Sequence, residues 1–174
     1  MTEARQPEPW LRGTLTEVHA VPRAVLHALQ LAEEDLVEWC GALSRQQLNT
    51  RPGGVASVAF QIRHIARSID RLLTYAEGQQ LSELQMAALR SEMDADATAT
   101  DVFGELRKSI EKAGARIREL ASDDLEAARS VGRKELPTTL GGLLVHIADH
   151  TQRHVGQAIT TAKLIRISKA GSSE

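Results

Sequence analysis

The chain has 174 residues, 42% of them hydrophobic, and a net charge of −2 with histidine neutral. This length fits one domain with its own core, and the single cysteine, Cys40, excludes an intramolecular disulfide. The acidic balance argues against nucleic-acid binding through a basic face, and no apolar run approaches the ~20 residues of a membrane span. The polar N-terminus is unlike a secretory signal, so we expect one cytoplasmic domain over residues 1–174 with its core at about 20–167.

The spacing of apolar residues predicts four main helices separated by loops. Apolar side chains recur every three or four residues over 22–43 and over 58–77, and Ser57 is a suitable N-cap for the second helix. Residues 101–121 and a long segment beginning after Thr138 or Thr139 show the same pattern. Between the second and third helices, Leu81–Met93 can hold a short helix, whereas Asp94–Thr100 and Ser122–Pro137 are expected to be loops. The sequence therefore predicts an all-α four-helix bundle with a long linker at residues 79–100.

The last predicted helix carries three histidines, His146, His150 and His154, at positions i, i+4 and i+8. Residues four apart lie about 6 Å from each other on one helix face, so two imidazoles at this spacing can reach a single ion. Relative to the apolar stripe, His154 is expected to point into the bundle, His150 to lie at its edge and His146 near the rim. His150 and His154 are therefore the predicted ligands, and His146 is an alternative ligand or a more distant contributor.

A third ligand is available on the second helix, where His64 lies along a polar strip with Gln61 and Ser68. If the polar edges of the two helices meet, three imidazoles converge and leave coordination positions open, as catalytic metal sites do. All-nitrogen ligation fits zinc, nickel or iron. Gln157 follows His154 on the same face, where it either orients a ligand or lies at the rim of the bundle.

The other histidines and the cysteine are expected to be structural. His19 precedes the first predicted helix, and His27 lies opposite the apolar stripe of that helix. Cys40 falls on the stripe, which predicts a buried thiol rather than a nucleophile. Gly156 is expected to allow a neighbouring helix to approach closely.

The segment 144–157 resembles the last-helix signature of the DinB-like family of four-helix-bundle metalloproteins, an HxxxH pair followed closely by Gly-Gln. The matching positions are His150, His154, Gly156 and Gln157. Residues 60–72 resemble the family's second helix, in which His64 matches the third ligand, while Val155 stands where the family often has arginine. The resemblance implies a divalent metal held by His64, His150 and His154, up-down-down-up connectivity and a homodimer.

The resemblance also bears on activity. Characterised relatives include thiol-dependent S-transferases and a thiol-dependent maleylpyruvate isomerase, which implies a metal ion and a low-molecular-weight thiol acting on a small-molecule substrate. Hydrolysis by metal-activated water is the second enzymatic hypothesis. Outside the enzyme class, the histidines bind metal for stability or line a polar core, and a third hypothesis is a metal or redox sensor with a protein partner.

Overall fold

The computed structural model describes residues 6–93 and 96–170, with side chains as far as Ile167. Residues 94–95, which fall in a predicted loop, and the two ends of the chain lie outside the described residues. The described part contains four long helices, α1 (Ala20–Cys40), α3 (Val58–Ala76), α5 (Ala99–Glu119) and α6 (Leu140–Ala170). The shorter helices are η1 (Pro9–Leu11), α2 (Arg45–Asn49), η2 (Pro52–Gly54) and α4 (Glu83–Arg90).

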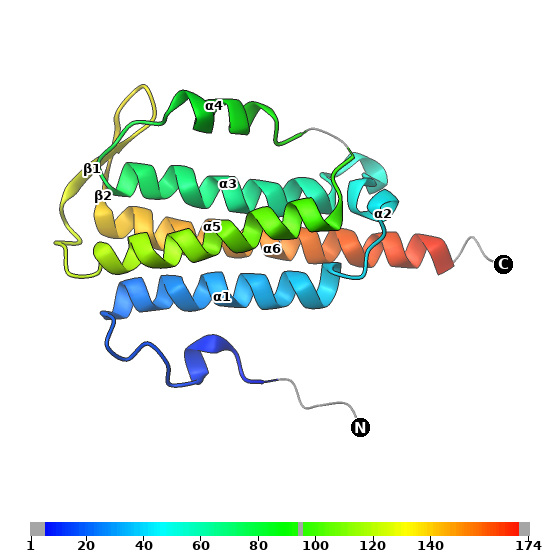
Figure 1. The fold of residues 1–174 in the computed structure, drawn as a ribbon, viewed down its shortest axis with the longest axis horizontal. Coiled ribbons are helices and arrows are strands. Elements are labelled where there is room, and N and C mark those ends of the chain that lie inside the picture. Colours follow the sequence, from blue (N-terminus) through cyan, green and yellow to red (C-terminus); the bar gives the residue numbers. More distant parts are fainter. Residues whose placement is uncertain (1–5, 94–95, 171–174) are drawn as a thin grey trace.

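The four long helices form a bundle in which α1 and α6 run in one direction and α3 and α5 run in the other (Figure 1). Both α1 and α3 pack against α5 and against α6, so α1 and α3 lie on one diagonal of the bundle and α5 and α6 lie on the other. Because α3 and α5 are parallel neighbours, the chain must return along the bundle between them, and α4 lies in this return (Figure 1). The predicted up-down-down-up topology is confirmed.

Side-chain caps set where the helices begin. Ser57 Oγ accepts a hydrogen bond from the Phe60 amide at 3.2 Å, as predicted for the start of α3. Before α6, Thr139 Oγ1 accepts from the Gly142 amide at 3.0 Å. These two caps fix the first residues of the helices that carry His64, His150 and His154.

The apolar stripes meet in one core. Their fully buried members include Leu29, Leu36, Ile62, Ile65, Ile69, Leu106, Ile117, Leu144 and Ile147. Cys40 also lies in this core with no exposed surface, as its position on the stripe predicts. Within the described range, none of the helices is both long and apolar enough to cross a membrane.

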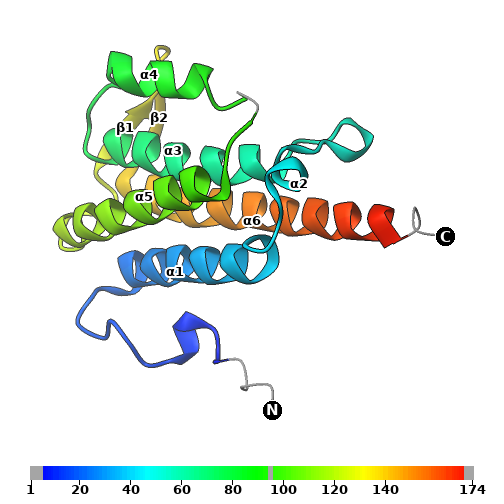
Figure 2. The same cartoon turned by 45° about the vertical axis from the view of Figure 1, so that its right-hand side comes forward.

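A β-hairpin and a short helix were among the elements not predicted from the sequence. The expected loop at residues 122–137 contains strand β1 (Ala128–Val131), which pairs antiparallel with β2 (Leu136–Thr139) at the end of the bundle where α6 begins (Figure 2). Four-residue strands are too short to show a clear alternation of apolar and polar residues, so this expectation was wrong over the hairpin. Helix α2 was missed because it has only five residues, although Ser44 and Gln47 form a capping box at its start.

His27 is a buried histidine with a partner, as the structural role expected for it predicts, whereas the expectation for Gly156 was wrong. His27 is buried, with 7% of its surface exposed, because the segment before α1 folds back over this face of the helix and places Thr14 Oγ1 3.1 Å from His27 Nε2. Arg12 fixes this segment through two hydrogen bonds of 2.7 Å to Glu34. Gly156 is exposed, and a Cβ atom added there would meet nothing within 4 Å, so no helix of the described part of the chain approaches it closely.

Candidate metal centre

Three histidines from two helices converge where α3 lies beside α6 (Figure 2). His64 comes from α3, and His150 and His154 come from successive turns of α6. Each offers a ring nitrogen, and these nitrogens all lie within 4.8 Å of one another. The ring centroid of His154 is 4.4 Å from that of His64 and 4.5 Å from that of His150. The polar edges of the two helices therefore meet as the sequence pattern predicts.

The Nδ1 atom of each of these three rings faces an oxygen acceptor. Glu92 Oε2 lies 2.7 Å from His64 Nδ1, and Gln61 Oε1 lies 2.6 Å from His154 Nδ1. Ser68 Oγ lies 3.4 Å from His150 Nδ1, and its own hydroxyl donates to the Ile65 carbonyl, so it accepts from the ring. These contacts place the proton of each neutral ring on Nδ1 and leave Nε2 with a free lone pair.

The Nε2 atoms of His64 and His150 face each other at 3.4 Å. Two lone pairs at this distance repel, and the repulsion is relieved when a cation lies between them. Two nitrogens bound to a tetrahedral ion at 2.0–2.1 Å stand about 3.4 Å apart, so the spacing of this pair suits a transition-metal ion. The donor set therefore fits a divalent metal, with His154 as the third ligand.

The charge state of the rings also suits metal binding. Burial, followed by the fields of His154, His64 and His146, lowers the pKa of His150 to about 4. Burial, followed by the fields of His64 and Arg153, lowers the pKa of His154 to about 4. Both rings are thus neutral at pH 7, which is the form that ligates metals.

Glu92 orients His64 and was not identified from the sequence. It follows α4 and is only 4% exposed, and its other oxygen accepts from Arg71 Nη1 at 2.5 Å. Burial raises the pKa of this carboxyl, but the hydrogen bonds from His64 and Arg71 outweigh burial and lower it. The sequence held one signal, because Arg71 lies two turns after His64 on one face of α3 and a cation there needs a carboxylate partner. The pattern does not identify which carboxylate is that partner.

Comparison with known proteins identifies the family. The profile of the DinB superfamily matches residues 28–158, about three quarters of the chain. The chain belongs to the DinB superfamily. Its fold is similar to that of YfiT from Bacillus subtilis, which is described as a probable metal-dependent hydrolase with an unusual four-helix bundle topology. The two structures superpose with a TM-score of 0.62 at 16% sequence identity, and the match covers 83% of this chain and 87% of YfiT. No curated protein matches the sequence.

The remaining histidines of this DinB superfamily protein lie outside the cluster. His146 is 45% exposed, its Nδ1 lies 2.9 Å from Asp149 Oδ1, and its ring centroid is 5.3 Å from that of His150. His146 thus lies at the rim, as predicted, beside the cluster rather than in it. His19 is exposed at the start of α1 and His27 is held by Thr14, so neither lies in the cluster.

Gln157 is exposed and lies just past the middle of α6, one turn after His154. Its side chain raises the pKa of His154, against the effect of burial on that ring. Val155, at the position where the family often has arginine, is buried in the core with 2% of its surface exposed. This DinB superfamily protein therefore has no cation at that position beside the histidines.

Proposed function

We propose that this protein is an enzyme that depends on a divalent metal ion held by His64, His150 and His154. The observation that supports the proposal is the shared orientation of the rings, in which each Nδ1 faces an oxygen acceptor and the Nε2 atoms remain for one ion. Zinc, nickel and iron all suit three imidazole ligands. A divalent ion in such a site lowers the pKa of water or of a thiol at its remaining positions.

The protein's own contribution is to position and desolvate these ligands. Glu92 holds His64 by a charge-assisted hydrogen bond, and a carboxylate in this position raises the basicity of the ring as a ligand. Gln61 and Ser68, both buried on α3, set the ring orientations of His154 and His150 across the interface with α6. The triad is therefore built on rigid helices rather than on loops, which favours a preorganised site.

Hydrolysis of a small-molecule substrate is the reaction that we propose first. Three neutral ligands leave the full charge of the ion available to acidify water, which is the usual basis of hydrolysis by a three-histidine site. YfiT, with a similar fold, is described as a probable metal-dependent hydrolase, and this description supports the same reaction here by analogy of fold.

Thiol S-transfer is the second proposal. The same uncharged donor set leaves a positive charge that attracts a thiolate, and the resemblance to the DinB-like family's thiol-dependent members supports a low-molecular-weight thiol as cosubstrate. Cys40 does not supply this thiol, because it is buried in the core and its pKa is raised to about 11, chiefly by burial. The thiol would therefore come from solution.

Metal content is the first test. Tag-free wild-type protein, His154→Ala and the control His19→Ala are analysed by metal mass spectrometry after loading with zinc, nickel or iron and desalting. We expect about one ion per chain in the wild type and in His19→Ala, and loss of the ion in His154→Ala. A folded wild-type protein that retains none of these metals would refute the proposal.

The loaded proteins then distinguish the two reactions. Hydrolysis predicts cleavage in a panel of activated esters and amides without added thiol, and S-transfer predicts consumption of an electrophile only when a thiol is present. Either activity must disappear on chelation and in His154→Ala. A metal that binds stoichiometrically with neither activity would favour a structural ion.

A homodimer is proposed from the resemblance to the family. Exposed apolar side chains on the outer face of α6 support it, since Leu164 is 45% and Ile167 is 68% exposed. Light scattering coupled to size-exclusion chromatography tests this proposal, and a mass of one chain at micromolar concentration would contradict it.

A further inference from the structure

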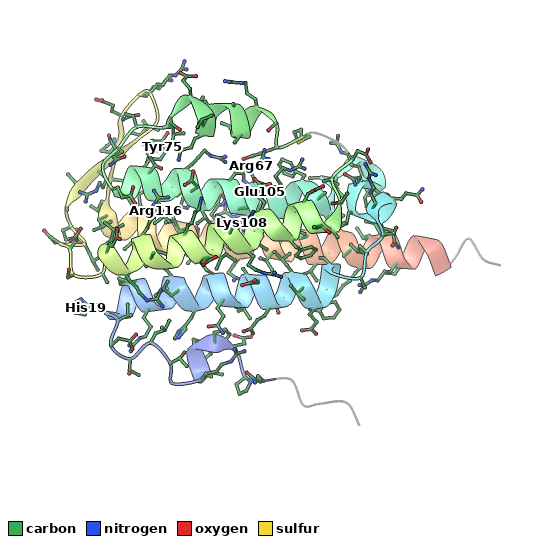
Figure 3. All side chains as sticks on the ribbon, in the orientation of Figure 1. His19, Arg67, Tyr75, Glu105, Lys108 and Arg116 are labelled. Carbon is green, nitrogen blue, oxygen red and sulfur yellow. The ribbon has the colours of Figure 1, made fainter. Side chains whose placement is uncertain are left out.

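A cavity lies between α3, α4 and α5, and it does not include the histidine cluster. Its volume is about 330 Å³, which is within the range of small-molecule sites. Small and aliphatic side chains line its floor, namely Ala66, Ile69, Leu73, Ala88 and Ala113. Figure 3 shows Arg67, Glu105, Lys108 and Arg116 along the side of α3 and α5 beneath α4.

The walls of this cavity are fixed by hydrogen bonds between the three helices. Arg67 on α3 donates to Glu105 on α5 at 2.6 Å and to the Ala88 carbonyl on α4 at 2.5 Å. Gln85 on α4 donates to Asp70 on α3 at 2.7 Å. Helix α4 is therefore held above α3, and the cavity is a preformed groove.

Arg116 closes the other end of the groove. Its guanidinium donates to Glu77 at 2.6 and 2.9 Å and to Asp70 at 2.9 Å, which joins α5 to α3. The arginines at both ends are thus engaged with carboxylates, so they shape the groove without offering a free charge.

The free charge comes from α5. Lys108 and Lys112 lie one turn apart on the groove rim and are exposed, and within the described residues no ion pair joins either to a carboxylate. The groove is lined by five cations, namely Arg67, Arg71, Lys108, Lys112 and Arg116, and by two carboxylates, Asp70 and Glu105. Because the three arginines pair with carboxylates, the local excess of positive charge is that of the two lysines, in a chain whose net charge is −2.

We propose that this groove binds a small organic anion, a molecule with an apolar body and one or two carboxylate, sulfonate or phosphate groups. The body would cover the aliphatic floor, where burial of apolar surface favours binding. The anionic group would lie at the rim, where two lysines on adjacent turns present ammonium donors to a single charge. An inorganic anion would leave the apolar floor uncovered, and a neutral molecule would leave the lysines unused.

This inference does not depend on the proposed metal enzyme. The groove lies on the side of α3 that faces α4 and α5, whereas the triad lies on the side that faces α6. One residue links the two sites, because Arg71 lines the groove and also donates to Glu92, the carboxylate that holds His64. Binding is therefore tested on protein treated with chelator, so that a missing metal cannot explain a missing ligand.

The probe is naphthalene-2-sulfonate, compared by calorimetry with the nearly isosteric neutral naphthalene-2-sulfonamide. We expect the sulfonate to bind the wild-type protein at least tenfold more tightly than the sulfonamide. Lys108→Ala/Lys112→Ala should lose at least tenfold in affinity for the sulfonate, because two surface cations are removed. The control Arg133→Ala/Lys134→Ala removes the same charge from the exposed tip of the hairpin and should bind as the wild type does.

A second variant tests the floor without changing charge. Ala88→Leu should fill the groove and weaken both probes, and leucine retains the helix propensity of α4. Circular dichroism checks that each variant is folded. Because Lys108 and Lys112 are exposed, their substitution by alanine is expected to leave the fold intact. Equal sulfonate affinity in Lys108→Ala/Lys112→Ala and the control, or competition by inorganic phosphate at the same concentration as the sulfonate, would overturn the proposal.

Discussion

Glu92→Gln tests whether the carboxylate beside His64 is part of the metal centre. Glu92 is 4% exposed and accepts from His64 Nδ1 at 2.7 Å and from Arg71 Nη1 at 2.5 Å. A carboxylate has two oxygen acceptors for these two donors, whereas a carboxamide has one. The NH₂ group of the new glutamine side chain would therefore face an N–H group of His64 or of Arg71, and the negative charge of Glu92 would be lost.

The size of the effect follows from these contacts. Removing the hydrogen-bond partner of a metal-ligating histidine typically lowers metal affinity about 10–100-fold, which corresponds to about 1.4–2.7 kcal/mol. Arg71, whose side chain is 11% exposed, would also lose its charged partner. The unfolding free energy of the metal-free variant is therefore expected to fall by up to about 3 kcal/mol.

The assay is competition for zinc between the protein and a chelating dye at neutral pH, with thermal melts of the metal-free proteins recorded in parallel. Glu83→Gln is the matched control, because this substitution removes the same charge from the first turn of α4, where Glu83 is exposed. We expect a weaker affinity in Glu92→Gln and an unchanged one in Glu83→Gln. If Glu92→Gln folds and binds zinc as tightly as the wild type, the orientation of His64 does not depend on this carboxylate.

Three further predictions concern the bundle. In the metal-free protein, the unfolding free energy should fall as pH drops from about 6.5 toward 4. His150 and His154 have a pKa of about 4 when folded and about 6.5 when unfolded, so the unfolded state binds more protons in this range. Denaturant titrations at several pH values should show a weaker dependence of the unfolding free energy on pH in His150→Ala/His154→Ala. Cys40, with its pKa raised to about 11, should resist iodoacetamide in the native state and react after denaturation, and rapid native labelling would contradict its burial. Thr139→Ala should cost about 1 kcal/mol and lower Tm by about 2–4 °C through loss of the hydrogen bond to the Gly142 amide, with Thr138→Ala as the control.

The bundle and most of its boundaries could be predicted because they depend on local patterns. Apolar residues at spacings of three and four define the buried stripes, and Ser57 and Thr139 mark helix starts by hydrogen bonding to nearby amides. The HxxxH spacing of His150 and His154 is likewise a property of one helix. These features involve contacts within a few residues, so the sequence is sufficient to specify them.

Segments that stabilise one another over longer distances were harder to predict. The hairpin at residues 128–139 has no strong pattern of its own, and the burial of His27 depends on the fold-back of the segment that carries Thr14. Periodicity describes one face of one helix and does not report which other segment will cover it.

The amino-acid sequence alone specifies the four long helices, their apolar faces and the position of His64, His150 and His154 along the polar edges of two of them. The partners of the rings come from the packing of separate segments. Glu92, 28 residues after His64, holds the Nδ1 atom of that ring, and Gln61 rather than another polar neighbour faces His154. The groove beneath α4 also depends on tertiary packing, because Arg67 and Gln85 must reach across helices to hold it open. A periodic pattern fixes the direction of a side chain around its helix axis, whereas the way separate helices pack sets which partner that side chain meets.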